Sequence, residues 1–178
     1  LKNQLEYLFD NGLTPSHFDS HHHITGVPLA FRASMEVAKQ FNITKARITN
    51  IDFWYKPGYT NYSLKLKQTL LSLPKSFIHH KNKRILRKNG FETPDYKVLP
   101  ARVYPSDKNH IKQFVNTLSI LKEGVTEISF HPGYPNSNPR DSEKTAQLRL
   151  RDLEVAKADI IKNYIRENKI QLINYKSL

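Results

Sequence analysis

Hydrophobic residues recur along the chain at two spacings, one typical of helices and one typical of strands. Leucines and Phe9 repeat at helical spacing at the start of the sequence, and Asn11-Gly12 follows as a common helix ending. A second helix is predicted over 28–40, because its proline stands where a first-turn proline is tolerated. Short apolar runs on either side of this helix, around 17–20 and 41–50, predict strands.

The second half of the chain continues the alternation. A strand is predicted near 97–104, and an amphipathic helix capped by Ser106 follows it. A short strand over 126–130 precedes helices within 142–168, and a last strand is predicted over 170–175. Such alternation is typical of βα units around a parallel sheet, so we expect an α/β protein that forms a single domain over 1–178.

Residues 52–96 interrupt this regularity with an aromatic cluster and a basic stretch, which we interpret as an insertion. The formal net charge is +12, and eight basic residues but no acidic one lie between 65 and 88. This stretch either binds phosphate groups or another anionic surface, or it forms a solvated helical hairpin. Charge runs usually describe a solvated face, so we expect no nucleic-acid partner.

The amino-acid composition further narrows the class of protein. The 178 residues are 38% hydrophobic, which suffices for one real core. No apolar run reaches the roughly 18 residues of a membrane span, and no secretory leader is visible, so we expect no membrane partner. With no cysteine, the sequence excludes disulfides and thiolate metal ligands, and it fits a reducing, cytoplasmic location.

The densest chemistry lies in the segment His17-Phe18-Asp19-Ser20-His21-His22-His23. It holds four of the eight histidines and a carboxylate in seven consecutive positions. Imidazole and carboxylate groups are ligands for Zn, Mn, Fe and Mg, and alternate residues of a strand face one side of a sheet. A solvated loop is the alternative. The segment predicts a metal site, with His17, Asp19 and His21 sharing one face.

Several motifs together resemble the YdjC-like family of carbohydrate deacetylases, which includes the chitooligosaccharide deacetylases. The motifs are Pro15 to Pro28, Gly90 to Asp95, His131-Pro132-Gly133, Arg149-x-x-Asp152-Leu153 and Gln171 to Leu178. The resemblance implies a deformed (β/α)7 barrel of the glycoside hydrolase/deacetylase type, incomplete at the N-terminus. The family pattern opens with an Asp-Asp strand and a Gly-x-His strand that are not among these residues, and the general base and two metal ligands are expected there.

The resemblance also implies an activity. It is the metal-dependent deacetylation of N-acetylated oligosaccharides such as chitooligosaccharides, an amide hydrolysis that releases acetate. His21 is implied to bind one divalent ion, Mg or Zn, and His131 to be the catalytic general acid. Asp19 lies two residues before His21 on the same strand face, so we expect it to orient a liganding imidazole, with direct binding of the ion as the alternative. Thr25 stands where the family usually has a further histidine.

Substrate contacts are expected from residues near the same rim. The candidates are His23, Arg47, Trp54, Tyr55 and Tyr59. Arginine can hold a carboxylate or a sugar hydroxyl, and aromatic rings can stack on pyranose rings. Core packing, loop packing or a structural ion pair is the alternative for each of them. Arg149 and Asp152, one helical turn apart, are explained sufficiently by an intrahelical ion pair.

A second function hypothesis is a non-catalytic member of the same fold. Without the Asp-Asp strand, such a protein would bind a sugar or a polyanion through the aromatic and basic residues of 52–96. An Asp-Asp motif encoded upstream favours the enzyme. The sequence leaves open whether the chain forms a homodimer.

Overall fold

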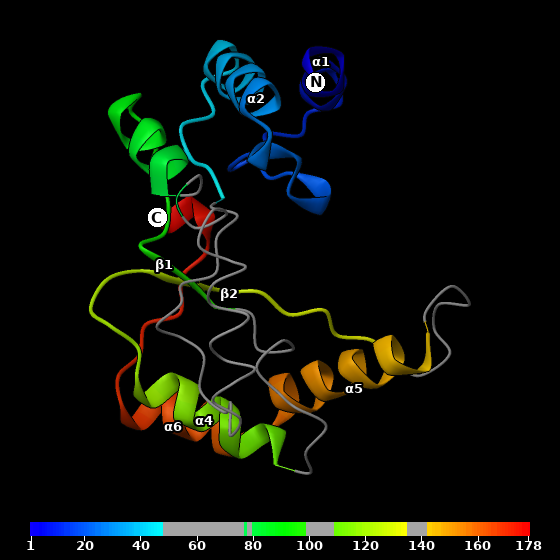
Figure 1. Ribbon diagram of the computed structural model, residues 1–178, viewed down its shortest axis with the longest axis vertical. Helices are drawn as coiled ribbons and strands as arrows, with labels where there is room; N and C mark the ends of the chain where they lie inside the picture. Colours follow the sequence, from blue (N-terminus) through cyan, green and yellow to red (C-terminus); the bar gives the residue numbers. More distant parts are fainter. Residues whose placement is uncertain (48–76, 78–79, 99–108, 135–141) are drawn as a thin grey trace. The chain divides into compact units, whose positions relative to one another are not determined.

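The computed structural model describes residues 1–47, 77, 80–98, 109–134 and 142–178 (Figure 1). The side chains of residues 21–23 also lie outside this description. The elements in chain order are α1 (Lys2–Asp10), the 3-10 turn η1 (His21–Gly26), α2 (Pro28–Gln40), a helix over 80–88, β1 (Tyr96–Val98), α4 (His110–Ser119), β2 (Thr126–Ile128), α5 (Glu143–Lys157), α6 (Asp159–Glu167) and the 3-10 turn η3 (Tyr175–Ser177).

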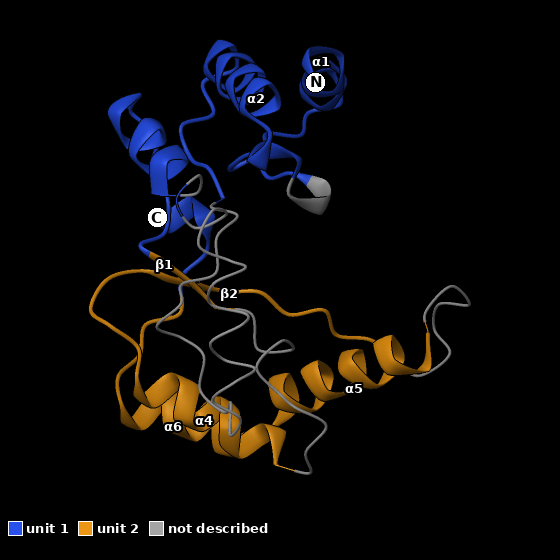
Figure 2. Ribbon diagram, in the orientation of Figure 1, with its two compact units in different colours: residues 1–50, 72–95, 173–178 blue, residues 51–71, 96–172 orange. Residues whose placement is uncertain are grey.

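The chain divides into two compact units (Figure 2). Unit 1 comprises Leu1–Asn50, Ser72–Asp95 and Ile173–Leu178, and unit 2 comprises Ile51–Leu71 and Tyr96–Leu172. The expectation of a single folded domain stays a prediction.

The core of unit 1 forms around one face of α2. Phe31, Met35 and Ala38 are spaced by four and three residues, so they lie on the same side of the helix, and all three are buried. Leu86 from the helix over 80–88 and Phe91 just after it pack into the same cluster. The predicted helix over 28–40 is confirmed, with its proline in the first turn.

Three extended segments of unit 1 run in parallel. Phe18 bridges to Ala46, and Lys45 bridges to Glu92, so the segment around 45–46 lies between the other two. The Phe18 N–H donates to the Lys45 carbonyl at 3.0 Å, and the Ala46 N–H donates to the Glu92 carbonyl at 3.0 Å. The strands expected around 17–20 and 41–50 therefore exist in the described residues as single bridges, and Ala46 is fully buried between its neighbours.

The described residues of unit 2 form a parallel pair of strands and three helices. β1 pairs with β2 in a register that aligns Lys97 with Glu127. The helices α4, α5 and α6 pack on one another through a buried cluster formed by Phe114, Leu118, Val155 and Ile161. Parallel pairing supports the expected α/β class, because parallel strands require crossover connections.

The expected strand over 170–175 is wrong. Lys169 adopts a left-handed conformation with φ of 53°, which ends α6 and redirects the chain. Residues 171–174 are then exposed and extended without strand pairing, and η3 follows. A strand needs a neighbour for its N–H and C=O groups, and in the described ranges none runs beside this segment.

No helix in the described ranges combines the length and the apolar character that a membrane span requires.

Candidate active site

The histidine-rich segment of unit 1 forms η1, and a hydrogen-bond network closes this turn. The Ser20 and Thr25 hydroxyls are hydrogen-bonded at 2.8 Å, and the Thr25 N–H donates to Ser20 Oγ at 3.3 Å. Asn82, on the helix over 80–88, donates through Nδ2 to the Thr25 carbonyl at 3.2 Å. Thr25 is buried. Thr25 thus closes the turn and attaches it to a helix.

Asp19 and Arg47 form an ion pair beside this turn. Arg47 Nη1 lies 2.5 Å from Asp19 Oδ2, and the Ser20 N–H donates to Asp19 Oδ1 at 2.6 Å. The bridge between Phe18 and Ala46 brings the two residues together, since each directly follows a bridge residue. Both carboxylate oxygens have a partner, so the Asp19 side chain is held in place, and its role toward a metal ion stays a prediction.

The Asp19–Arg47 pair is half-exposed, so we expect a small contribution to stability. Arg47→Ala should lower the free energy of unfolding by less than about 1 kcal/mol, because side chains that are 25% and 38% exposed are partly screened by solvent. The loss should shrink further in about 1 M salt. Urea unfolding at two salt concentrations measures it, with Lys2→Ala, which breaks the more exposed pair to Glu6, as the matched control. A large, salt-independent loss would contradict this interpretation.

His17 is already engaged by its surroundings. Its ring stacks on Tyr175 with centroids 3.7 Å apart and planes inclined by 6°, and Ser16 Oγ lies 2.9 Å from its Nδ1. A groove of about 640 Å³ between α1 and α2 reaches His17 and Asp19. Sequence reasoning did not identify the Tyr175 contact, for which the only signal was the family motif around 171–178.

In unit 2, His131 follows β2 and is exposed. Its backbone N–H donates to Asp152 Oδ2 at 2.8 Å, and the Gly133 N–H donates to the Arg149 carbonyl at 3.2 Å. Two hydrogen bonds to α5 therefore fix the backbone of this segment while the His131 side chain faces solvent. The sequence explained Asp152 by an ion pair with Arg149, whereas the structure shows Asp152 holding the candidate acid.

Asp152 is fully buried, and this changes its acidity. Burial raises the pKa of its carboxyl group above the ordinary 3.8, while the hydrogen bond from the His131 N–H and the charge of His131 oppose part of that rise. Within the described residues, Oδ1 has no hydrogen-bond partner. A buried carboxylate with one unsatisfied oxygen is costly in its ionised form.

The raised pKa predicts a pH dependence. A carboxyl group whose pKa is higher in the folded state stabilises the fold fully below its unfolded pKa, and the contribution is lost as pH rises through the folded pKa. Asp152→Asn keeps an acceptor for the His131 N–H but cannot ionise, so the variant should gain stability relative to the wild type as pH rises above 3.8. Urea unfolding over a pH series tests this, and parallel pH profiles would contradict it.

A second polar network in unit 2 was not found from the sequence. Lys97 Nζ lies 3.2 Å from Glu127 Oε1, and the Ser129 hydroxyl donates to the same oxygen at 2.7 Å. The network lies in the same strand pair that leads to His131. The available signal was a lysine and a glutamate inside two short predicted strands.

Several predicted site residues cannot be placed. Trp54, Tyr55 and Tyr59 lie outside the described residues, as do the side chains of His21 and His23. The backbone of His21 belongs to unit 1 and that of His131 to unit 2. Their convergence on one site stays a prediction.

The fit of a metal ion depends on the histidine turn. Among the described side chains, no three His, Asp or Glu groups lie close enough to hold an ion. The donor set of η1 nevertheless has suitable chemistry, since it offers consecutive imidazoles next to a carboxylate anchored by Arg47.

Comparisons with known proteins define the class. The model of the YdjC-like protein family matches residues 1–167, so the chain belongs to this family. It is 25% identical over 178 residues to a carbohydrate deacetylase of Clostridium beijerinckii and 24% identical over 178 residues to one of Thermoanaerobacter pseudethanolicus. These matches cover 99% and 100% of this chain, but only 59% and 58% of the two relatives.

A solved structure supports the same fold. A protein of Enterococcus faecalis V583 named for cellobiose-phosphate cleavage matches with a TM-score of 0.65 and 19% identity. The match covers 98% of this chain and 57% of that one. The chain therefore spans a little over half the length of the proteins it resembles, in structure as in sequence.

Proposed function

We propose that this chain carries residues of the active site of a metal-dependent carbohydrate deacetylase, which releases acetate from N-acetylated oligosaccharides such as chitooligosaccharides. The family match and the names of the curated relatives support the reaction class. The structural observation that carries the proposal is His131, whose side chain is exposed while its backbone is fixed by Asp152 at the end of β2. Strand ends are where reacting groups lie in βα barrels.

The proposal includes the deformed (β/α)7 barrel. The parallel pairing of β1 with β2 and the likeness to the Enterococcus structure support it. In such a barrel the loops after the strands form the rim of a concave site. His23, Arg47, Trp54, Tyr55 and Tyr59 are the proposed sugar contacts.

Amide hydrolysis needs an activated water, a stabilised oxyanion and a proton for the leaving amine. His21 would hold a divalent ion, Mg or Zn. When bound, this ion would polarise the substrate carbonyl and lower the pKa of a water molecule. His131 protonates the leaving amine, because imidazole exchanges protons near neutral pH. Asp152 keeps the His131 backbone in place, and the Arg47–Asp19 pair supports the segment that leads into η1.

The test is acetate release from diacetylchitobiose by the protein as it is encoded, with Mg or Zn added and after treatment with a chelator. We expect release with metal and its loss after chelation. Absence of release under both conditions would favour the alternative, a non-catalytic member of the fold that binds a sugar or a polyanion. A cytoplasmic location and a homodimer stay predictions.

A further inference from the structure

The helix over 80–88 has one buried side and one strongly basic side. Leu86 is buried, Ile85 packs against the core, and Asn82 donates to the Thr25 carbonyl, so these residues define the inner side. At 100° per residue, positions 80, 81, 84 and 88 lie together on the other side, and all four are exposed. The basic face is defined here as His80, Lys81, Lys83, Arg84, Arg87 and Lys88.

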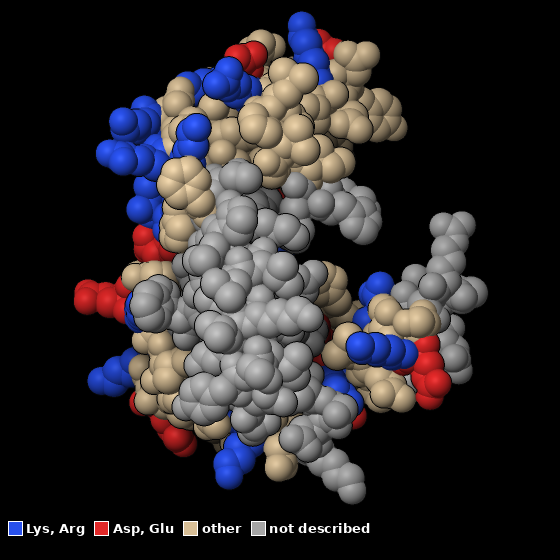
Figure 3. Space-filling view, in the orientation of Figure 1, with Lys and Arg blue, Asp and Glu red and all other residues tan. Residues whose placement is uncertain are grey.

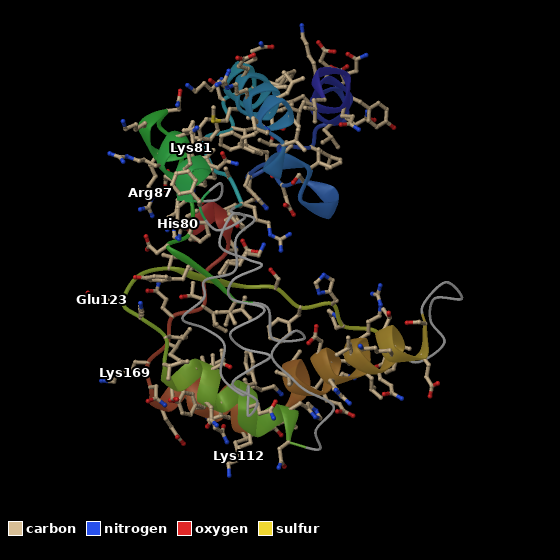
Figure 4. All side chains as sticks on the ribbon, viewed as in Figure 1. His80, Lys81, Arg87, Lys112, Glu123 and Lys169 are labelled. Carbon is tan, nitrogen blue, oxygen red and sulfur yellow. The ribbon has the colours of Figure 1, made fainter. Side chains whose placement is uncertain are left out.

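The basic face forms a recess as well as a charged surface. A shallow pocket of about 540 Å³ is lined by His80, Lys83, Arg84, Arg87 and Lys88, and none of these lining residues is acidic. Lys and Arg side chains gather over this helix in Figure 3, and His80, Lys81 and Arg87 extend from it in Figure 4. Phe77, three residues before His80, is 75% exposed.

The arrangement of charge on the basic face is unfavourable for the helix alone. Arg84 and Lys88 are four residues apart, as are Lys83 and Arg87, and each like-charged pair costs a few tenths of a kcal/mol. Asp95 offsets part of this repulsion. Its carboxylate lies 2.6 Å from Arg87 Nη2, and its carbonyl accepts from Lys83 Nζ. Among the described residues, this ion pair sets the single carboxylate of Asp95 against five cationic side chains, and the resulting positive field is one that an anionic ligand would neutralise.

Asp95 also orients two of the cations. Holding Lys83 and Arg87 in fixed positions reduces the conformational entropy that these side chains lose when a ligand binds. The face extends over nine residues of helix, or about 12 Å at the usual rise per residue. This length suits two or three charged groups along a single chain.

We propose that the basic face binds an anionic glycan, a sugar chain that bears sulfate, phosphate or carboxylate groups. Arginine and lysine are suited to each of these groups, and the exposed ring of Phe77 offers an apolar contact for a pyranose. The choice of a glycan over other polyanions rests on the proposed function. The face lies opposite the Asn82 side that contacts η1, so the bound chain is held apart from the histidine turn.

Binding of a heparin-derived octasaccharide, measured by calorimetry at several salt concentrations, tests the proposal. We expect log K to fall linearly with log salt with a slope of about two to three, because that many cations are neutralised. Arg84→Glu/Lys88→Glu should weaken binding at least tenfold and reduce the slope. The matched control is Lys112→Glu/Lys169→Glu, which makes the same charge change in unit 2 (Figure 4) and should weaken binding less than threefold.

Three results would overturn the proposal. They are absence of octasaccharide binding, equal losses in the two double variants, and equally tight, equally Arg84-dependent binding of single-stranded DNA of the same charge. If Arg84→Glu/Lys88→Glu does not fold, as judged by circular dichroism, octasaccharide binding is measured on Arg84→Gln/Lys88→Gln in its place. Octasaccharide binding is measured without turnover. A failure to release acetate would therefore reject the proposed reaction without changing the outcome of the binding test for the basic face.

Discussion

His21→Ala will lower kcat/KM for acetate release from diacetylchitobiose by about a thousandfold in the protein as it is encoded. In the proposed reaction, removing this imidazole donor would weaken the binding of an ion that contributes several kcal/mol of transition-state stabilisation, and about 4 kcal/mol corresponds to three orders of magnitude in rate. The metal content of the purified variant should fall in parallel. Acetate assays and elemental analysis on the same samples measure both effects.

His22→Ala is the matched control, because it removes an imidazole from the same turn. We expect His22→Ala to keep its activity within about threefold of the wild type, because His22 has no proposed contact with the metal ion or the substrate. Equal losses in both variants would indicate that η1 had lost its structure. Full activity of His21→Ala would remove His21 from the proposed site.

Lys97→Met will lower the free energy of unfolding by about 3–5 kcal/mol, the usual cost of removing one member of a buried ion pair. Lys97 is 0% exposed, and Glu127 is 12% exposed. After the substitution, the Glu127 carboxylate keeps the hydrogen bond from the Ser129 hydroxyl but loses the positive charge of Lys97. Urea unfolding monitored by far-ultraviolet circular dichroism measures the loss.

The double variant Lys97→Met/Glu127→Leu separates charge from packing. Replacing both partners by apolar groups is often neutral, so the double variant should be clearly more stable than Lys97→Met alone. Lys162→Met breaks the exposed pair with Asp159 and should leave stability unchanged. If the double variant were less stable than Lys97→Met, the ion pair would not be the cause of the loss.

The helices were predictable because their signals are local. In α2 the buried residues repeat within a single helix, and Pro28 marks its first turn. For the strands, the sequence predicted the approximate positions of some of them but not their pairing. The segments around Phe18 and Ala46 pair through single bridges, and the expected strand over 170–175 has no neighbour in the described residues, because strand pairing depends on chain segments that are far apart in sequence.

In the candidate site too, local features were predictable from the sequence and contacts between distant residues were not. The position of His131 after a short strand followed from the sequence, because an apolar run precedes it. The contact with Asp152 did not, since the two residues are 21 positions apart and an ion pair with Arg149 explained the spacing equally well. The Lys97–Glu127 pair depends on the register of β1 against β2, which the sequence alone does not determine.

The stacking of His17 on Tyr175 constrains the order in which the protein can fold during synthesis. Lys45 reinforces this contact by donating to the Lys176 carbonyl at 2.9 Å. A ribosome adds about 5–20 residues per second, so roughly ten to thirty seconds separate the emergence of the two rings. For that time His17 lacks its Tyr175 partner, and folding of unit 1 is completed only after translation has passed residue 176.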